Sequence, residues 1–515
     1  MSLIQALLNP AAYPHPVNNI ELIETHISWV LLTGQYAYKI KKNIQFDFLD
    51  FSTLEKRHYY CEEELRFNGR FAPDLYLKVV PITGSLLEPH IGGTGDIIEY
   101  AVQMKQFDGG QLLSHLAERG ELTAAIIDQL ADLTAKFHSS ARADTSSSHF
   151  GTAQEIHHWV QGNFAHIKPL IGHTGLMQQI LELEQWGEQA LLKNAALMQQ
   201  RKQAGFIREC HGDLHLGNIT LIDNKVTPFD GIEFNPSLHW IDTISEIAFV
   251  VMDLQQRGFA QLAYRFLNRY LSKGGDYQGV ALLPYYLVYR AMVRCKVALL
   301  RWQQHQNRQD FQEAQSYADL ATSYSRSKPA KLVITHGYSG SGKSTLSAQL
   351  AEKAGMIHLR SDVERQRLLD KVQHNTASNE VNQGLYTPDN VLFVYRRLAE
   401  LASICLDTGF SVLIDAAFLQ SNQRQLFAQL ALNKKLEFVI LDFYAPEQEL
   451  KRRISQRLQS GADASEATIA VLEHQLKTAQ PLTAAELEKT IRVDTCDKDA
   501  LDKLMAISTL TTASH

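Results

Sequence analysis

Residues 337–344 read Gly-Tyr-Ser-Gly-Ser-Gly-Lys-Ser, a full match to the Walker A pattern G-x-x-x-x-G-K-[ST]. The apolar run Leu332–His336 precedes this loop and a helical pattern follows it, which is the context that the motif requires. Glycines let the loop curl so that its amides point at phosphate oxygens. We expect Lys343 to reach the β- and γ-phosphates of ATP and Ser344 to bind Mg²⁺. The predicted ATP-binding residues are Gly337, Ser339, Gly340, Ser341, Gly342, Lys343, Ser344 and Thr345.

The chain after this loop alternates short apolar strands with helical stretches. The clearest strands are Ser411–Asp415, Phe438–Tyr444 and Ile491–Asp494. Alternation of this kind favours a parallel sheet wrapped by helices. The sequence therefore predicts an α/β P-loop NTPase domain over residues 332–515.

Two acids and two arginines of this half are candidates for the chemistry. Asp415 ends an apolar strand, where a Mg²⁺-binding or acceptor-orienting carboxylate is expected, although it could instead be a turn residue. Asp362 could accept the proton of a substrate hydroxyl, or could cap a helix. Arg453 and Arg457 share one helix face, which is either a lid over the phosphates or a solvated basic surface. Arg424 is a further candidate.

A second motif lies far upstream. Residues 211–218 read His-Gly-Asp-Leu-His-Leu-Gly-Asn, and Pro-Phe-Asp-Gly-Ile-Glu-Phe-Asn follows at 228–235. The spacing matches a kinase catalytic loop followed by a metal-binding acid. Asp213 would receive or orient the proton of the attacking hydroxyl, and Asn218 and Asp230 would hold Mg²⁺ against the phosphates. His211 is expected to tie the two segments together.

The residues before this motif are predicted to form a sheet and then helices. Polar and apolar residues alternate over 20–40 around Thr33-Gly34, which is typical of a hairpin. Residues 52–68 begin with a Ser-x-x-Glu pattern that makes Ser52 the expected helix cap. The predicted organisation is a protein-kinase-like two-lobed α+β domain over 1–325 (small lobe about 1–105, large lobe about 106–325), a linker at 326–331, and the P-loop kinase domain at 332–515.

The loop HGDLHLGN resembles the signature of aminoglycoside phosphotransferases and of choline and fructosamine kinases. The wider chain resembles a bacterial bifunctional family in which an aminoglycoside-phosphotransferase-like domain is fused to a P-loop ATP-binding domain. Stretches that carry this resemblance include IETHISWVLLTGQYAYKIKK, DGIEFNPSLHWIDTISEIAFVVMDL and SVLIDAAF. The second half is also similar to zeta-toxin-like and gluconate-kinase-like small-molecule kinases.

The resemblance implies further ATP contacts in the first half. Lys39 is similar to the strand lysine that pairs with the α- and β-phosphates, with Lys41 as the alternative two residues on. The helix glutamate that would pair with this lysine is Glu64, or one of its neighbours Glu62 and Glu63.

The first half departs from the kinase pattern at two places. No G-x-G-x-x-G precedes Lys39, so cover for the phosphates would come from the Thr25–Ser28 region or be missing. The metal-binding acid is followed by Gly-Ile-Glu rather than Phe-Gly, and Glu233 is either a further metal-side acid or a surface residue.

Composition sets limits on the class of protein. The net charge of −6 gives no general reason to expect binding to nucleic acids or to anionic membranes. The five cysteines are an odd number at wide spacings, which argues against a disulfide framework and fits a reducing compartment. There is neither a signal-peptide pattern nor a run of 18 apolar residues, so we predict a cytoplasmic protein with no membrane partner.

These features together predict an ATP- and Mg²⁺-dependent kinase with two sites, each transferring the γ-phosphate to the hydroxyl of a small metabolite. One alternative is a single catalytic domain with the other domain acting as a regulatory ATP-binding module. Another is a nucleotide- or RNA-end kinase, against which the acidic balance counts. The sequence names neither the acceptors nor the oligomeric state.

Overall fold

The computed structural model describes residues 2–46, 49–145, 148–172, 175–326, 329–375, 388–460, 468–507 and 510. The chain divides into two compact units. Unit 1 comprises Met1–Gln129, Lys136–Asn163 and Gln189–Asp253, and unit 2 comprises Leu130–Ala135, Phe164–Glu188 and Leu254–His515. The predicted domain boundary stays a prediction, and Ser327 and Lys328 of the predicted linker lie outside the described residues.

Unit 1 begins with a six-stranded antiparallel sheet of order β1-β2-β3-β8-β6-β7. The predicted hairpin is present, and Gly34 makes its turn at a φ of 91° that favours glycine. Tyr38 and Ile40 of β3 point into a core shared with Leu7 and Val80. The strands are β1 (Glu21–Glu24), β2 (Ser28–Leu32), β3 (Tyr36–Lys41), β6 (Tyr76–Gly84), β7 (Pro89–Ile91) and β8 (Ile97–Lys105), beside the short pair β4 (Gln45–Phe46) and β5 (Leu49–Asp50).

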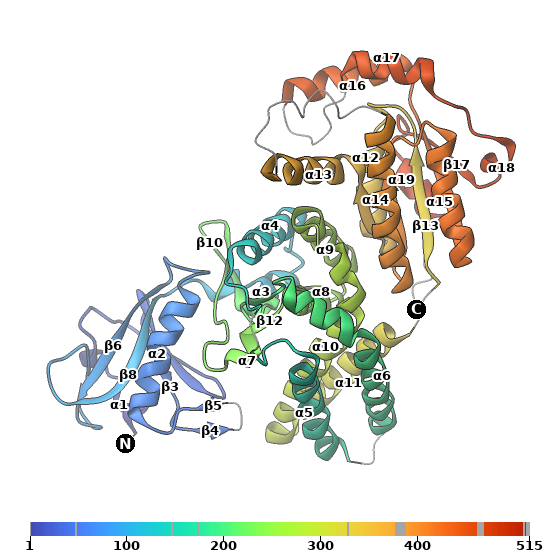
Figure 1. The fold of residues 1–515 in the computed structure, drawn as a ribbon. Coiled ribbons are helices and arrows are strands. Elements are labelled where there is room, and N and C mark those ends of the chain that lie inside the picture. Colours follow the sequence, from blue (N-terminus) through green and yellow to red (C-terminus); the bar gives the residue numbers. More distant parts are fainter. Residues whose placement is uncertain are drawn as a thin grey trace. The chain divides into compact units, whose positions relative to one another are not determined.

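The helix α2 (Leu54–Asn68) packs on β6 and β8 (Figure 1). Its cap is Thr53, whose hydroxyl accepts a hydrogen bond from the Lys56 amide at 3.3 Å. The prediction of Ser52 as the cap was wrong by one residue, because the Ser52 hydroxyl instead donates to Asp50 at 2.6 Å. Glu64 on this helix is fully buried, which places a carboxylate under the sheet.

The rest of unit 1 consists of helices and two small antiparallel strand pairs, β9–β12 and β10–β11. The predicted catalytic loop runs from the end of β9 to the start of β10. The strands are β9 (Ile207–Glu209), β10 (Ile219–Ile222), β11 (Lys225–Pro228) and β12 (Trp240–Asp242). The helices that lie wholly or partly in unit 1 are α1 (Leu3–Ala6), η1 (Pro10–Ala12), η2 (Gly109–Gln111), α3 (Leu113–Glu118), α4 (Ala124–Ser140), α5 (Ala153–Ile171), α6 (Gly175–Gln203), η3 (Leu216–Asn218), α7 (Pro236–His239) and α8 (Thr243–Gln256).

Unit 2 is built on a five-stranded parallel sheet of order β14-β15-β13-β16-β17. Its core contains Val333, Leu350, Leu413 and Leu441. The strands are β13 (Lys331–His336), β14 (Ile357–Arg360), β15 (Val412–Asp415), β16 (Glu437–Tyr444) and β17 (Thr490–Asp494). Because the strand order reverses beside β13, the loop at its carboxyl end lies at a switch point, where α/β sheets bind ligands.

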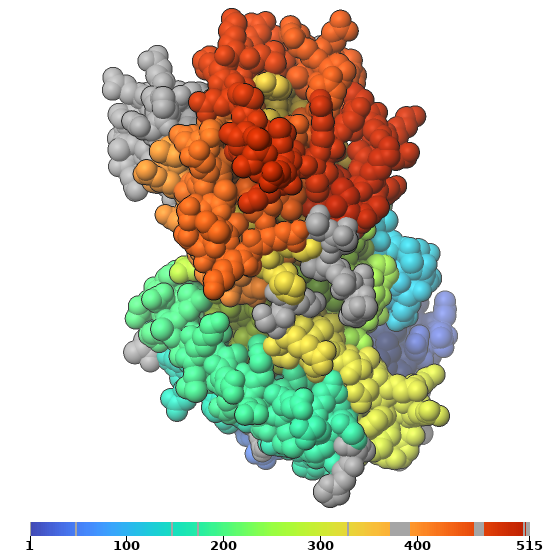
Figure 2. Space-filling model, turned by 90° about the vertical axis from the view of Figure 1, so that its right-hand side faces the viewer, coloured from blue at the N-terminus to red at the C-terminus, as the bar shows by residue number. Residues whose placement is uncertain are grey.

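Helices surround this sheet, and Figure 1 shows α12, α14 and α15 beside β13. In Figure 2, red C-terminal segments surround a small patch of the yellow stretch that holds β13. The helices that lie wholly in unit 2, some of them away from this sheet, are α9 (Ala260–Gly274), η4 (Tyr277–Leu282), α10 (Leu283–His305), α11 (Arg308–Ser325), α12 (Lys343–Ala354), α13 (Ser361–Asn375), α14 (Pro388–Asp407), α15 (Ser421–Lys434), α16 (Glu447–Ser460), α17 (Ile469–Thr478), α18 (Ala484–Leu487) and α19 (Ala500–Met505).

The predicted fold class is confirmed, with an α+β arrangement first and a parallel α/β sheet second. None of the helices in the described part of the chain combines the length and the apolar character that crossing a membrane requires.

Candidate active sites

The loop between β13 and α12 is packed tightly against neighbouring backbone. Gly337, Gly340 and Gly342 have φ values of 143°, 81° and 82°, in the region that favours glycine. A Cβ on Gly337 would lie 2.5 Å from the Phe443 carbonyl oxygen, and one on Gly340 would lie 2.7 Å from that of Leu450. Both the backbone conformation and the close approach therefore require glycine in this loop.

Lys343 is the first residue of α12, and its side chain turns back over the loop. Its Nζ donates hydrogen bonds to the carbonyl oxygens of Gly337 at 2.9 Å and Tyr338 at 2.8 Å. Burial lowers the pKa of Lys343 to about 8, against the opposing charges of Asp415 and Asp362. The ammonium group therefore lies inside the loop, at the start of a helix whose dipole favours anions.

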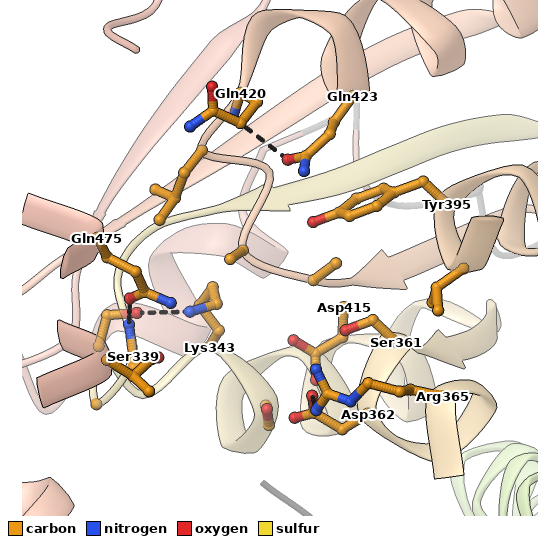
Figure 3. Close-up of a pocket in the computed structure, with 18 of the residues that line it drawn as sticks. Ser339, Lys343, Ser361, Asp362, Arg365, Tyr395, Asp415, Gln420, Gln423 and Gln475 are labelled. Atoms are coloured by element: carbon orange, nitrogen blue, oxygen red, sulfur yellow. Dashed lines mark hydrogen bonds and ion pairs between the residues drawn. The ribbon is translucent and has the colours of Figure 1, made fainter. Parts of the chain in front are cut away.

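A cavity of about 1110 Å³ opens over this loop. It brings together side chains from α12, α13, β15, α16 and α17. Figure 3 shows Ser339 and Lys343 toward one end of the cavity, and Asp362, Arg365 and Asp415 grouped toward the other. The sequence-predicted residues that line the cavity are Ser339, Gly340, Ser341, Gly342, Lys343, Ser344, Thr345, Asp362, Asp415, Arg453 and Arg457.

Asp415 is the last residue of β15 and is buried. Its Oδ2 lies 3.7 Å from Nε of Arg360 and 4.0 Å from Nε2 of His358, both on the neighbouring strand β14. Burial lowers the pKa of His358 to about 4, so its ring is neutral at neutral pH. The Asp415 carboxylate therefore has one permanently charged neighbour, Arg360. It lies at the carboxyl end of the sheet, where the sequence predicts a Mg²⁺ ligand.

Asp362 lies in the first turn of α13, one residue after its start. Its Oδ1 accepts a hydrogen bond from Nη2 of Arg365 at 2.5 Å, and both side chains line the cavity. Arg365 was not among the predicted residues. The spacing of three residues from Asp362, which puts both on one helix face, was the signal that could have identified it.

The two predicted arginines of α16 both line the cavity, but their surroundings differ. Arg453 donates through Nε to Glu449 at 2.6 Å and through Nη1 to the Thr495 hydroxyl at 2.8 Å. It therefore ties α16 to the segment after β17. Arg457 is one helical turn further along. Arg452, the residue just before Arg453 on the helix, has a side chain that is 56% exposed. Arg452 therefore faces solvent and not the cavity.

Arg424 has a structural position instead of a catalytic one. It is fully buried and donates through Nε to Glu486 at 2.7 Å and through Nη1 and Nη2 to the carbonyl oxygens of Phe418 and Pro481. The guanidinium group therefore fastens α15 to the chain before β17. Arg424 does not line the cavity, and these partners engage its guanidinium group, so the structure gives the prediction of a site role no support.

Gln475 of α17 contacts the phosphate-binding loop directly. Its Oε1 accepts a hydrogen bond from the Ser339 amide at 2.9 Å (Figure 3). The sequence carries no sign of this contact, because the two residues are 136 positions apart and Gln475 belongs to no recognisable motif.

In unit 1, one buried carboxylate joins the two lysines of β3. Lys39 donates to Glu64 Oε1 at 2.7 Å and Lys41 donates to Glu64 Oε2 at 2.8 Å. Lys39 also pairs with Asp230, and Lys41 pairs with Glu233. Five charged groups thus alternate in the order Asp230, Lys39, Glu64, Lys41, Glu233.

The pKa values of this cluster follow from burial and pairing. Burial alone would lower the pKa of both lysines, but the neighbouring carboxylates raise them above the ordinary value. Burial would raise the pKa of Glu64, and the two lysines lower it. Glu233 is buried, which excludes the reading of a surface residue. Of the alternative glutamates, Glu62 lies near His58 at 3.6 Å and Glu63 pairs with Arg66 at 2.9 Å.

The predicted catalytic loop is fixed by hydrogen bonds from several elements. Nδ2 of Asn218 donates to the carbonyl oxygen of Asp213 at 3.0 Å and to its Oδ2 at 2.8 Å. Glu246 of α8 accepts from the amides of His211 and Gly212 at 2.5 and 2.9 Å. Asp213, Asn218 and Asp230 are therefore held on short segments of unit 1, with side-chain exposures of 33% for Asp213 and 45% for Asp230.

His211 ties the two segments together, as the sequence predicts. Its Nε2 lies 2.8 Å from the carbonyl oxygen of Phe229, and its Nδ1 accepts from the Asp213 amide at 3.3 Å. Burial lowers the pKa of His211, in spite of the nearby Glu246 and Asp213 carboxylates. A neutral ring that carries its proton on Nε2 satisfies both contacts.

Comparisons with known proteins match both a part of this chain and nearly its whole length. A family model described as an AAA domain matches residues 332–482. Uncharacterised proteins of Mycobacterium tuberculosis and Mycobacterium bovis are each 28% identical over 479 residues, which is 91% of this chain and 94% of the relative.

Solved structures are similar to parts of this chain. A choline/ethanolamine kinase family protein from Mesorhizobium loti is 11% identical and covers 62% of this chain and 92% of its own, with a TM-score of 0.39. A sugar kinase from Janibacter is 21% identical and covers 36% of this chain and 99% of its own, with a TM-score of 0.27. By the family match and the order of the parallel sheet, residues 332–482 carry an AAA-type P-loop domain.

Proposed function

We propose that this protein is an ATP- and Mg²⁺-dependent phosphotransferase with two sites, each passing the γ-phosphate of ATP to a hydroxyl of a small metabolite. The observation that carries the proposal for the second site is a cavity of about 1110 Å³, lined by the phosphate-binding loop, two carboxylates and three arginines. Its volume lies at the upper end of small-molecule sites, which leaves room for an acceptor beside a nucleotide.

In unit 2, the amides of residues 340–345 and the start of α12 would bind the phosphates, and Lys343 would exchange its carbonyl partners for phosphate oxygens. Ser344 and Asp415 offer the hard oxygen donors that Mg²⁺ prefers, and the bound ion would neutralise phosphate charge. Asp362 would take the proton of the acceptor hydroxyl at its carboxylate. Arg365 supports this role, since its hydrogen bond at 2.5 Å holds the Asp362 carboxylate in a fixed position.

In unit 1, Lys39 would contact the α- and β-phosphates while Glu64 holds its side chain in place. Asp213 would orient the attacking hydroxyl, and its hydrogen bond to Asn218 supports a fixed position. Asn218 and Asp230 supply oxygen atoms suited to Mg²⁺.

The proposal is tested by transfer of labelled γ-phosphate from ATP into a filtered metabolite extract, with products identified by mass spectrometry. Wild type, Asp213→Ala and Lys343→Ala are compared. We expect each variant to lose a different labelled product. If wild type hydrolyses ATP yet labels no metabolite, the proposed function is wrong and a macromolecular acceptor or an ATPase role takes its place.

A regulatory role for the first site is the second candidate, and one observation favours it. The turn between β1 and β2 contains no glycine, and the amides of Thr25, Ile27 and Ser28 are already engaged. The Thr25 hydroxyl accepts from the amides of Ile27 at 3.4 Å and Ser28 at 2.9 Å, and the Thr25 amide donates to the Ser28 carbonyl. A turn of this kind offers few donors to a γ-phosphate. If Asp213→Ala labels every product that wild type labels, while Lys39→Met abolishes ATP binding to unit 1, the regulatory role is supported.

A further inference from the structure

The strand β14 is an edge of the parallel sheet, and a side chain of helix α9 completes its hydrogen bonding. Nδ2 of Asn268 donates to the carbonyl oxygen of Met356 at 2.9 Å, and its Oδ1 accepts from the amide of His358 at 2.9 Å. The Asn268 side chain is buried. One amide group therefore offers the donor and the acceptor that a further strand would supply, at an edge that would otherwise leave both backbone groups unpaired.

Two further contacts join α9 to the same region of unit 2. Nη1 of Arg265 donates to Oε1 of Glu352 on α12 at 3.0 Å. Nη2 of Arg367 on α13 donates to the carbonyl oxygen of Ser272 at 2.5 Å. Arg367 also lies so close to Gly275, the left-handed residue that ends α9, that a Cβ there would approach its Nε to 2.5 Å. Helix α9 is thus bonded to β14, α12 and α13.

Helices α12 and α13 both line the cavity, at residues other than those that α9 contacts, and β14 leads directly into α13. Helix α12 begins with Lys343 and Ser344, whereas Glu352 is near its other end. Strand β14 leads into Asp362 on α13. The same strand presents His358 and Arg360 toward Asp415, at 4.0 and 3.7 Å. A shift of β14 at its contact with Asn268 would therefore move both carboxylates of the cavity.

We infer that Asn268 of α9 is a positioning residue of the P-loop site. Its two hydrogen bonds hold β14 in place, and β14 in turn positions the Asp362 and Asp415 carboxylates. This inference rests on the proposed function of that site. The position of the phosphate-binding loop depends less on β14, because this loop joins β13 to α12. Loss of the Asn268 contacts should therefore lower kcat at the P-loop site much more than it weakens nucleotide binding.

The test uses the full chain with Asn268→Leu, which keeps the size of the side chain but removes both hydrogen bonds. Asn268→Asp is the intermediate variant, since it keeps an acceptor for His358 but loses the donor to Met356. Arg269→Ala is the matched control, because Arg269 is the next residue of α9 and pairs with Asp132 instead, at 2.6 Å. Asp213→Ala is present in every variant, so that turnover reports the P-loop site.

Hydrogen exchange of the β14 amides and of the first turn of α13 is measured first. In Asn268→Leu we expect these amides to exchange roughly fivefold to tenfold faster, from the loss of one or two buried hydrogen bonds. We expect kcat for ATP turnover to fall at least about tenfold, while the Kd for ADP changes less than about threefold. Asn268→Asp should lie between, and the Arg269→Ala control should match wild type in all three measurements.

Unchanged exchange in Asn268→Leu would overturn the inference, and so would faster exchange with unchanged kcat, because α9 would then merely cover the sheet. If the chain shows no turnover at the P-loop site even without substitution at Asn268, the proposed function fails. The inference is then decided by exchange alone: it stands if β14 and the α13 turn lose protection in Asn268→Leu and keep it in Arg269→Ala, and it falls otherwise.

Discussion

Glu64 and Lys41 form a buried ion pair at 2.8 Å, directly beside the pair between Glu64 and Lys39. The two carboxylate oxygens of Glu64 are thus divided between two lysines. In the proposed function the pair with Lys39 is the one that serves ATP binding, and Lys41 with its second partner Glu233 is additional to it. Both Lys41 and Glu233 are fully enclosed, so their charges are stable only while each keeps its partner.

Removing one member of this additional pair should therefore be costly. We expect Lys41→Met and Glu233→Gln each to reduce the free energy of unfolding by about 3–5 kcal/mol, as for a broken buried pair. The double variant should recover a large part of the loss, since no unpaired charge remains. Urea denaturation of the four proteins measures this as a double-mutant cycle. Lys78→Met, an exposed lysine of the same sheet, is the control, and additive losses in the cycle would contradict the prediction.

The buried His239 should make unit 1 sensitive to acid. Burial lowers the pKa of His239 from 6.5 to about 4. The unfolded chain therefore binds the extra proton between pH 6.5 and about 4, so stability is lost as the pH falls through that window, by up to about 3 kcal/mol. His239→Asn should flatten this dependence, because its amide can still donate to the Ile232 carbonyl, which the ring contacts at 2.6 Å. Unfolding between pH 4 and 7.5 is measured, with His58→Asn, a half-exposed histidine of the same unit, as the control. An unchanged slope in His239→Asn would refute it.

Gly340→Ala should distort the phosphate-binding loop. The new Cβ would meet the Leu450 carbonyl at 2.7 Å, and the φ of 81° is strained for alanine. We expect a loss of stability of about 2 kcal/mol or more and a loss of nucleotide binding at this site. Gly162→Ala, at a helical position with open space around it, is the matched control. Calorimetric titration with ADP, in a Lys39→Met background, reports the binding; wild-type affinity in Gly340→Ala would show that the loop adapts.

Arg424→Met should affect folding rather than catalysis. The variant leaves Glu486 without its guanidinium partner and three backbone carbonyls without a donor. We expect a loss of about 3–5 kcal/mol in stability and little change in kcat at a temperature where the variant is folded. Thermal unfolding and turnover at low temperature separate the two effects. A large fall in kcat with unchanged stability would restore Arg424 to the list of catalytic candidates.

The local motifs could be predicted from the sequence because they depend on neighbouring residues. The loop at 337–344 needs only its glycines and the helix start, and the hairpin around Gly34 needs only alternation and a turn residue. The helix cap was missed by one residue because Ser52 and Thr53 have the same chemistry. The choice between them was made by Asp50, which engages the Ser52 hydroxyl.

Contacts between distant residues depended on the tertiary structure. Lys39 and Lys41 have the same strand orientation, so periodicity could not choose between them, and packing of α2 placed Glu64 within reach of both. Burial alone distinguishes Arg424 from the arginines of the cavity. Asn268 lies 88 residues before the strand that it completes, and its amide has no local signature. The sequence by itself determined the two motifs and the two fold classes, because these follow from local chemistry and periodicity. Tertiary structure decided which charges are paired and which element supports each site, because pairing and burial are properties of residues brought together in space.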